Sequence, residues 1–244
     1  MTDNPIRTAL VTGASRGFGL ALTAALAERG TTVVACARSA DRLHAAVAGL
    51  PAAQRVVAVP ADITDPAGRA ALVTAAAQAG GLDLLVHNAG SLGPSPLPPL
   101  ADLPVEALRE VLESNVVAPL ALTRLALPLL RASDAPSIVT LSSDAAVEAY
   151  PGWGGYGAAK AALDRLAAVF GAELPGWAVY AFDPGDMRTD MHQRAFPGED
   201  ISDRPEPATV VPALLRLLDE RRPAGRYRAA DLAADVSVTA GGPS

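Results

Sequence analysis

The chain has 244 residues, a mass of 24.8 kDa and a formal net charge of −6, from 20 basic and 26 acidic side chains. Half of the residues are hydrophobic, which excludes a disordered chain, although only 4% are aromatic. The negative net charge gives no basic surface for nucleic acid or an anionic membrane. No apolar run approaches the ~18 residues of a membrane span, and a single cysteine, Cys36, excludes an internal disulfide.

Short β-branched runs alternate with longer stretches rich in alanine and leucine, which is typical of strand-helix-strand units in a parallel sheet. Brief apolar runs bounded by Gly, Pro or Asp predict seven strands, at Arg7–Thr12, Thr32–Ala37, Arg55–Val59, Leu82–His87, Ser137–Leu141, Ala178–Phe182 and Arg226–Ala229. Helices are predicted at Gly19–Arg29, Ser39–Leu50, Pro66–Gln78, Val105–Arg131, Tyr156–Leu174 and Pro207–Arg221. The right-handed crossover rule places them on both faces of one doubly wound α/β sheet.

We predict one domain over residues 1–232 and a flexible tail over 233–244, where the residues are small and polar. The segments Ser91–Pro104 and Met187–Ala208 have weak periodicity and several prolines, and both follow strands. Open parallel sheets bind ligands beyond the carboxyl ends of their strands, so we expect these loops to form a substrate lid. The N-terminus carries no signal peptide pattern, and we expect the protein in a reducing cytoplasm.

The first strand leads into Thr12-Gly13-Ala14-Ser15-Arg16-Gly17-Phe18-Gly19 and then a helix. Glycines allow a tight turn and the close approach of a pyrophosphate, whose charge the exposed N–H groups and the helix dipole receive. A glycine-rich turn without a ligand is the alternative. The Gly-x-x-x-Gly-x-Gly spacing resembles the short-chain dehydrogenase/reductase family, single-domain type. The resemblance implies a Rossmann-like fold of about seven mostly parallel strands, and a nicotinamide dinucleotide at Gly13, Ser15, Arg16, Gly17, Phe18 and Gly19.

The end of the second predicted strand indicates which dinucleotide is bound. A fold that prefers NAD places a carboxylate there for the ribose hydroxyls, and this chain has Ala37-Arg38-Ser39 instead. Arg38 and Arg16 can give a 2′-phosphate charge-assisted hydrogen bonds, which favours NADP(H) over NAD(H); the alternative is that both arginines are solvated. The resemblance implies further cofactor contacts at Ser39, Asp62, Ile63, Asn88, Ala89 and Gly90, and we give the neighbouring His87 no catalytic role.

Tyr156-Gly157-Ala158-Ala159-Lys160 lies in a predicted helix and places a phenol and an amine one turn apart. A neighbouring ammonium favours the phenolate, so it lowers the phenol pKa from about 10 toward the range of a proton shuttle. Tyr-x-x-x-Lys is frequent by chance, but Lys160 is the only lysine in the chain. Because arginine stands at every other basic position, we interpret residue 160 as one that requires a compact ammonium group.

The family resemblance adds residues around this pair. Ser143, thirteen residues before Tyr156, would hydrogen-bond the reacting oxygen, whereas the adjacent Ser142 is interpreted as a hydroxyl bonded to backbone. Asn115 is unfavourable inside a helix and would hold a water that passes protons to Lys160; a solvent-facing helix residue is the alternative. After the sixth strand, the family's Pro-Gly turn and following threonine imply cofactor contacts at Pro184, Gly185, Met187 and Thr189, in addition to Tyr156 and Lys160.

The resemblance spans Arg7 to Arg222 and implies an NADP(H)-dependent oxidoreductase that interconverts a carbonyl and a secondary alcohol by hydride transfer, with no metal. The alternatives are a non-catalytic dinucleotide-binding regulator or scaffold, and a dehydratase or epimerase, for whose substrate domain 244 residues leave little room. A small to medium hydrophobic substrate is predicted from the candidate pocket residues Ser91, Leu92, Ala145, Tyr150, Trp153, Met187, Met191 and Phe196. By the same resemblance we expect a homodimer or homotetramer, with a dimer through the long helices.

Overall fold

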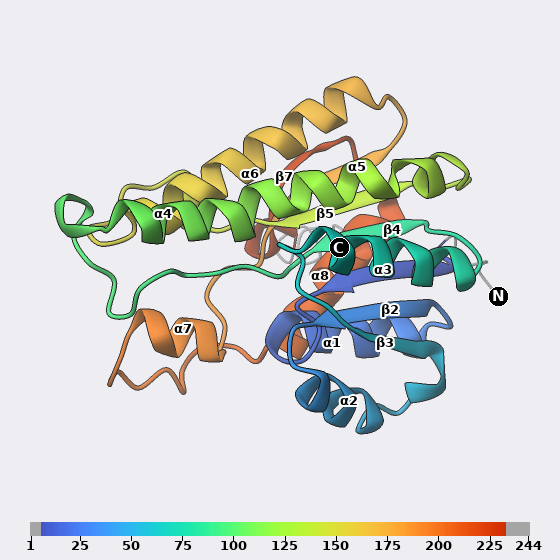
Figure 1. Cartoon of the computed structure of the whole chain (residues 1–244), viewed down its shortest axis with the longest axis horizontal. Helices are drawn as coiled ribbons and strands as arrows, with labels where there is room; N and C mark the ends of the chain where they lie inside the picture. The colour runs from blue at the N-terminus through green and yellow to red at the C-terminus, as the bar shows by residue number, and fades with distance from the viewer. Residues whose placement is uncertain (1–5, 233–244) are drawn as a thin grey trace, which may run out of the picture.

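Figure 1 shows the computed structural model, which describes residues 6–232. Seven strands form one sheet in the order β3-β2-β1-β4-β5-β6-β7, and all pairs of neighbours are parallel. The strands are β1 (Thr8–Thr12), β2 (Thr32–Ala37), β3 (Val56–Pro60), β4 (Leu84–His87), β5 (Ser137–Leu141), β6 (Ala178–Asp183) and β7 (Gly225–Arg228). Each of the seven predicted strands is present, with ends that differ by one or two residues at most. The predicted tail, 233–244, lies outside the described residues.

Helices cover both faces of the sheet. One face carries α1 (Gly17–Glu28), α2 (Ala40–Ala48) and α8 (Pro207–Glu220), and the other carries α3 (Pro66–Gln78), α5 (Ala118–Arg131) and α6 (Gly154–Glu173). Along β1, Leu10 packs toward α3 and α5, whereas Ala9 and Val11 pack toward α1 and α8. The strands β1, β4, β5 and β6 are buried at every position, as in a parallel sheet covered on two sides. The predicted doubly wound α/β fold is confirmed.

The helix predicted over Val105–Arg131 consists of three segments that follow one another along one line in Figure 1. They are α4 (Val105–Leu112), the π-helical turn η3 (Glu113–Val117) and α5. Pro119 has no N–H, so the α-helical hydrogen bond to the carbonyl of Asn115 cannot form, and the chain widens into a π turn there. The predicted helical stretch is therefore present over its full range, but it includes a π-helical turn, and that turn contains Asn115.

The starts of the helices differ in how their free N–H groups are satisfied. Ser39, Asp65 and Thr189 cap α2, α3 and the short helix α7 (Asp190–Ala195), each by accepting a backbone N–H. At α1 the N-cap residue, Arg16, makes no such bond, and the first turn contains no acidic residue. The free N–H groups of α1 and the positive end of its dipole therefore remain available at the carboxyl edge of the sheet.

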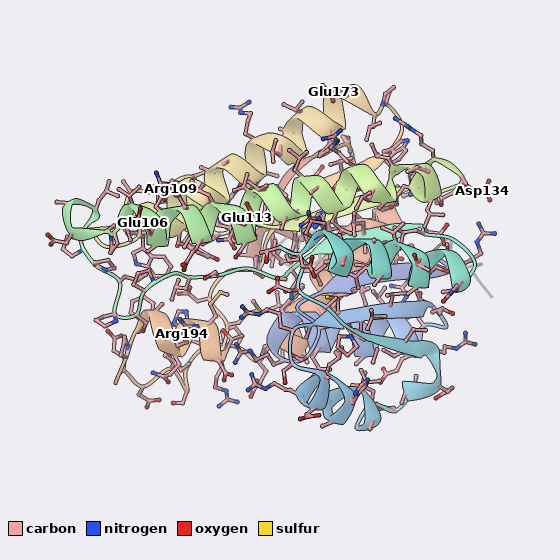
Figure 2. All side chains as sticks on the ribbon, viewed as in Figure 1. Glu106, Arg109, Glu113, Asp134, Glu173 and Arg194 are labelled. Atoms are coloured by element: carbon pink, nitrogen blue, oxygen red, sulfur yellow. The ribbon has the colours of Figure 1, made fainter. Side chains whose placement is uncertain are left out.

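The two predicted lid loops meet beyond the carboxyl ends of the strands. The segment after β4 contains η2 (Leu100–Asp102) and runs between α4 and α7 (Figure 1). Ser95 Oγ donates to the carbonyl of Arg194 (2.6 Å), and Arg194 Nη2 donates to the carbonyl of Gly93 (3.3 Å). Figure 2 labels Arg194 on α7, next to this segment. The loops thus form one joined layer over the edge of the sheet.

Two further 3-10 turns, η1 (Ala53–Arg55) and η4 (Asp144–Ala146), precede β3 and follow β5. The turn η4 packs directly against the start of α6, and it therefore brings the end of β5 close to that helix. Within residues 6–232, no helix has the length and apolar character needed to cross a lipid bilayer.

Candidate active site

A cavity of about 1110 Å³ lies at the carboxyl edge of the sheet, beside the start of α1. Most residues predicted to contact the dinucleotide line it, namely Gly13, Ser15, Arg16, Gly17, Phe18, Arg38, Ser39, Asp62, Ile63, Asn88, Ala89, Gly90, Met187 and Thr189. Gly19, Tyr156, Lys160, Pro184 and Gly185 do not line it. The structure therefore gathers one group of predicted residues around a single cavity and leaves Tyr156 and Lys160 outside its lining.

The glycine loop makes a tight turn at the bottom of this cavity. Gly13 and Gly17 have φ values of +70° and +56°, in the left-handed region that favours glycine. A Cβ at Gly19 would lie 2.4 Å from the carbonyl oxygen of Gly13, so Gly19 permits the turn without lining the cavity. Together with the free N–H groups of α1, this cradle fits a pyrophosphate.

Asn88 holds the glycine loop in place from the end of β4. Its Nδ2 donates to the carbonyls of Thr12 (2.8 Å) and Gly13 (3.1 Å). In return, Thr12 Oγ1 accepts the backbone N–H groups of Asn88 and Ala89, both at 3.0 Å. The sequence analysis did not select Thr12, although its place at the strand end directly before the loop was a usable signal.

Arg16, Arg38 and Arg42 are among the arginines that line the cavity. Partial burial would raise the pKa of Asp62, but hydrogen bonds from Thr64 and the nearby Arg38 outweigh it and lower that pKa. Arg42 was missed by the sequence analysis, although it lies four residues after Arg38 at the start of α2. The arginines fit a 2′-phosphate, which needs planar cationic donors.

Arg16 also connects the glycine loop to the lid. Its Nη1 lies 2.5 Å from Asp190 Oδ2 in the first turn of α7, and both side chains are more than half exposed. Thr189 Oγ1 accepts the N–H of His192 (3.1 Å) and so caps the same helix. Thr189 thus has a structural role at the cavity wall, and the predicted contact of its hydroxyl with the cofactor stays a prediction.

Tyr156 and Lys160 lie one turn apart near the start of α6, and both are buried, with 8% and 5% exposure. Lys160 Nζ lies 5.4 Å from the centre of the Tyr156 ring and donates to the carbonyl of Leu141 at the end of β5 (2.6 Å). A Cβ placed on Gly90 would lie 4.0 Å from Lys160 Nζ. Because Gly90 lines the cavity, the cavity ends beside the buried amine.

Asn115 projects from the π turn toward the segment after β4. Its Oδ1 accepts the N–H of Ser91 (2.7 Å), its Nδ2 donates to the carbonyl of Ser91 (2.8 Å), and the residue is 1% exposed. The solvent-facing alternative is therefore wrong, because the side chain ties two loops together. Its Oδ1 would lie 2.8 Å from a Cβ at Gly90, on the same glycine that Lys160 approaches. The predicted water relay from Asn115 stays a prediction.

The two serines at the end of β5 have different partners. Ser143 Oγ donates to Asp144 Oδ1 (2.9 Å) and accepts the N–H of Ala145 (3.2 Å) at the start of η4. Ser142 Oγ donates to Asp164 Oδ2 at 2.6 Å, and its contact with the Ser143 carbonyl is longer, at 3.4 Å. The main partner of Ser142 is therefore a carboxylate on α6 rather than the backbone.

The pKa expectation for the phenol is wrong in this structure. Burial raises the pKa of Tyr156, and the carboxylates of Asp144, Asp183 and Asp164 raise it further. Burial lowers the pKa of Lys160 to about 8, against the opposite effect of Asp164 and Asp183. An ammonium 5.4 Å from the ring centre does not outweigh desolvation and three carboxylates, so the phenol keeps its proton at neutral pH.

Apolar and aromatic side chains surround the Tyr156 ring. Trp153 meets it edge to face, with ring centres 5.8 Å apart, and contacts Phe196 at the end of α7, also at 5.8 Å. The buried cluster comprises Leu92, Ala145 and Tyr156, with Leu97, Trp153 and Ala195 packed against it. Of the other predicted pocket residues, Ser91, Met187 and Met191 line the cavity, and Tyr150 is 44% exposed with its hydroxyl on Asp144 (3.1 Å).

His87 lies on β4 away from these groups. Its Nε2 is 2.7 Å from Thr123 Oγ1 on α5, and burial lowers its pKa to about 3. The side chain is therefore neutral at working pH and packs between the sheet and α5, which agrees with the absence of a catalytic assignment.

Residues 7–200 match the family described as short chain dehydrogenase. The chain belongs to the short-chain dehydrogenase family. The family resemblance seen in the sequence is confirmed, and so is the expectation of an oxidoreductase enzyme rather than a protein of another class.

Relatives and solved structures agree with the match. The uncharacterized oxidoreductase YciK of Escherichia coli K12 is 32% identical over 240 residues, which cover 90% of this chain and 89% of YciK. The 1-deoxy-11-beta-hydroxypentalenate dehydrogenase of Streptomyces exfoliatus is 38% identical, covering 77% of this chain and 70% of that enzyme. A Shigella flexneri short chain dehydrogenase, solved in complex with NADP, has a TM-score of 0.84 at 30% identity, with 92% and 97% of the two chains covered.

Gly157 permits the close contact between α6 and η4 that brings Tyr156 toward the end of β5. A Cβ at this position would lie 2.6 Å from the carbonyl oxygen of Ala145, so Gly157→Ala should push the two elements apart. We expect a loss of about 1–3 kcal/mol in stability and a fall of about 10²-fold in dehydrogenase turnover. Thermal melting and steady-state kinetics measure both. Gly49→Ala, whose Cβ would have its nearest neighbour at 3.6 Å, should leave turnover unchanged, and equal losses in the two variants would contradict the assignment.

Proposed function

We propose that this protein is an NADP(H)-dependent oxidoreductase that interconverts a carbonyl and a secondary alcohol, with Tyr156 as the general acid or base. One observation carries the proposal: a phenol and the only lysine of the chain are buried together beside Gly90, which lines a cavity that Arg16, Arg38 and Arg42 also line. A binding-only regulator needs the cavity but not a phenol and an amine buried beside it. This arrangement favours the enzyme over the regulator.

Two observations support NADP(H) as the cofactor. Arg38 and Arg42, which follow the second strand, line the cavity together with Arg16, and the end of that strand carries no carboxylate for a ribose. The Shigella flexneri relative was solved with NADP. When bound, the reduced cofactor supplies the hydride; the glycine loop and the start of α1 would hold its pyrophosphate.

In the reductive direction, Tyr156 gives its hydroxyl proton to the carbonyl oxygen while the carbonyl carbon accepts the hydride. Its raised pKa keeps that proton in place at neutral pH, so the residue is ready to act as an acid. Lys160, charged below its pKa of about 8, stabilises the phenolate that forms. Ser143 donates to the reacting oxygen once its hydroxyl leaves Asp144. Alcohol oxidation runs the same steps backward and needs the phenolate first.

The surroundings of Tyr156 support a small to medium hydrophobic substrate. A carbonyl that reaches the phenol passes Trp153, Leu92 and Phe196, which present aromatic and aliphatic surface. These apolar contacts would supply most of the substrate affinity.

We also propose a homodimer through α5 and α6. Three large apolar side chains on this side of the molecule are partly exposed, Val117 at 48%, Leu125 at 46% and Val169 at 41%. Their burial in a helix-to-helix interface would remove them from water. Action in the cytoplasm and the single-domain organisation of residues 1–232 remain predictions from the sequence.

Tyr156→Phe keeps the ring in its apolar cluster and removes the proton donor. We expect turnover to fall by at least about 10²-fold while NADPH affinity stays nearly unchanged. NADPH oxidation with a panel of hydrophobic ketones and aldehydes, and a fluorescence titration with NADPH, measure the two effects. Tyr227→Phe removes a hydroxyl that donates to the Pro223 carbonyl and serves as the control. Parallel loss of turnover and affinity would refute the role of Tyr156.

Arg38→Ala removes one guanidinium from the predicted 2′-phosphate site. A charge-assisted hydrogen bond contributes about 1.5–3 kcal/mol, so the KM for NADPH should rise roughly 10- to 100-fold while the KM for NADH stays the same. Steady-state kinetics with both cofactors measure this. Arg55→Ala, an arginine that donates to the Gly30 carbonyl away from the cavity, should change neither constant. A KM that rises equally for NADH would contradict the assignment.

The pH dependence should differ between the two directions. Lys160 is charged below its pKa of about 8 and neutral above it, so carbonyl reduction should be constant from about pH 6 to 7 and then decline, with a midpoint near this pKa. Alcohol oxidation should rise over the same range because Tyr156 must first lose its proton. Rate profiles in both directions measure this. In Lys160→Arg, the residual reduction should lack the decline, since a guanidinium stays charged; an unchanged decline would exclude Lys160 as its source.

A further inference from the structure

Three charged residues outside the predicted site form a cluster directly behind it. The guanidinium of Arg226 on β7 donates from Nε to Asp164 Oδ2 on α6 (3.1 Å). Its Nη2 donates to Asp183 Oδ2 at the end of β6 (2.8 Å) and to the carbonyl of Ser143 at the end of β5 (2.9 Å). One side chain therefore joins three elements of the fold.

Each partner of Arg226 lies next to a group that the proposed reaction uses. Asp164 is one helical turn after Lys160, and its Oδ2 also accepts the hydroxyl of Ser142. Asp183 precedes the Pro184-Gly185 turn, and its Oδ1 accepts the N–H of Gly185 (3.0 Å). The third partner is the backbone of Ser143 itself. A movement of the Arg226 side chain would therefore change the positions of α6, Ser143 and the Pro184-Gly185 turn.

We propose that Arg226 is a positioning residue for the carbonyl reduction proposed above. It fixes Ser143, α6 and the Pro184-Gly185 turn relative to one another, and it neutralises two carboxylates that would otherwise attract Lys160. Arg226 touches neither substrate nor cofactor, and its effect passes through these neighbours. The inference rests on the proposed function for its kinetic part only, because the effect on Lys160 can be measured without turnover.

The charge balance of the cluster supports this role. The side chains of Asp183 and Asp164 are 4% and 14% exposed, so each carboxylate needs a cationic partner. Asp164 Oδ1 is buried and has no hydrogen-bond partner among residues 6–232. Arg226 and Lys160 are the two cations that act on these carboxylates. With Arg226 in place, Lys160 Nζ stays on the Leu141 carbonyl.

Loss of Arg226 would leave Lys160 as the remaining cation beside two buried carboxylates. The groups that would then determine its titration are Asp164 and Tyr156 on α6 and Asp183 on β6, with Asp144 of η4 acting on the same phenol. The ammonium would be drawn from the Leu141 carbonyl toward the carboxylates, and its charged form would be favoured. Both changes would misplace the proton-transfer group.

The geometry requires arginine in particular. Three acceptors, on three elements, receive N–H groups from one planar fork. A lysine at this position keeps the charge but presents a single nitrogen, which cannot span the same acceptors. Charge and positioning are therefore separable by substitution.

Arg226→Met removes both the charge and the planar set of donors, whereas Arg226→Lys keeps the charge alone. Arg228→Met, which replaces an exposed arginine on the same strand, is the matched control. Lys160 is the only lysine, so biosynthetic incorporation of [ε-¹³C]lysine labels one residue in the wild type, Arg226→Met and Arg228→Met, and an NMR titration reports its pKa without turnover. Arg226→Lys carries two labelled residues, and its Lys160 signal is assigned as the one that disappears when Lys160→Arg is added. In Arg226→Met we expect that pKa to rise above about 8 and kcat for carbonyl reduction to fall about 10- to 100-fold, with a smaller change in the KM for NADPH. Arg226→Lys should restore the pKa but not kcat. Arg228→Met should change neither.

Thermal melting shows whether each variant is folded. Should Arg226→Met not fold, Asp183→Asn removes one of the two carboxylates, and the pKa of Lys160 should then fall instead of rise. An unmoved Lys160 pKa in folded Arg226→Met or, where that variant does not fold, in Asp183→Asn would overturn the proposal, and so would a kcat loss shared by Arg228→Met. If the wild-type protein reduced no carbonyl, the proposed function would be refuted. The Lys160 titration would still show whether Arg226 holds the two carboxylates.

Discussion

The buried hydrogen bond from Lys160 Nζ to the carbonyl of Leu141 is the contact on which the site depends. An ammonium that is 5% exposed is strongly unfavourable unless it has partners, and here a strand carbonyl and two nearby carboxylates supply them. The bond attaches α6 to the end of β5, and that attachment sets where Tyr156 lies relative to Ser143 and to the end of the cavity. Neither the glycine loop nor the arginines would produce chemistry without it.

The elements and motifs that local patterns define could be predicted from the sequence. Buried parallel strands are short continuous apolar runs, and the glycine loop and the Tyr156–Lys160 pair each lie within one strand-turn-helix or one helical turn. The Arg226 cluster could not be predicted in the same way. It depends on β6 pairing in parallel with β7, which places Arg226 beside Ala181, and no local pattern fixes the register of strands separated by α7 and α8.

The predicted direction of the Tyr156 pKa shift is wrong for a similar reason, because it too depends on contacts between distant segments. A spacing of four residues correctly predicts that an amine and a phenol are neighbours, but it contains no information on how much water reaches them. Burial of Tyr156 follows from packing by Leu92 and Trp153, which come from the segment after β4 and the start of α6. The carboxylates that raise the pKa further lie in η4, at the end of β6 and farther along α6. Desolvation is a property of the assembled fold, so the sign of the shift emerges only there.

The site combines a rigid part with a weakly held part. Lys160, Asp183 and Ser142 make buried bonds to strands and helices, whereas α7 is joined to the glycine loop by Arg16 and Asp190, side chains 51% and 67% exposed. Exposed ion pairs contribute only about 0–1 kcal/mol, and the guanidinium of Arg16 is also one of those available to a 2′-phosphate. A 2′-phosphate on Arg16 would thus compete with one of the weakest contacts of the site, whereas the contacts that orient the phenol are among the strongest. Loss of the ion pair between Arg16 and Asp190 on cofactor binding would therefore leave the groups that transfer the proton in place.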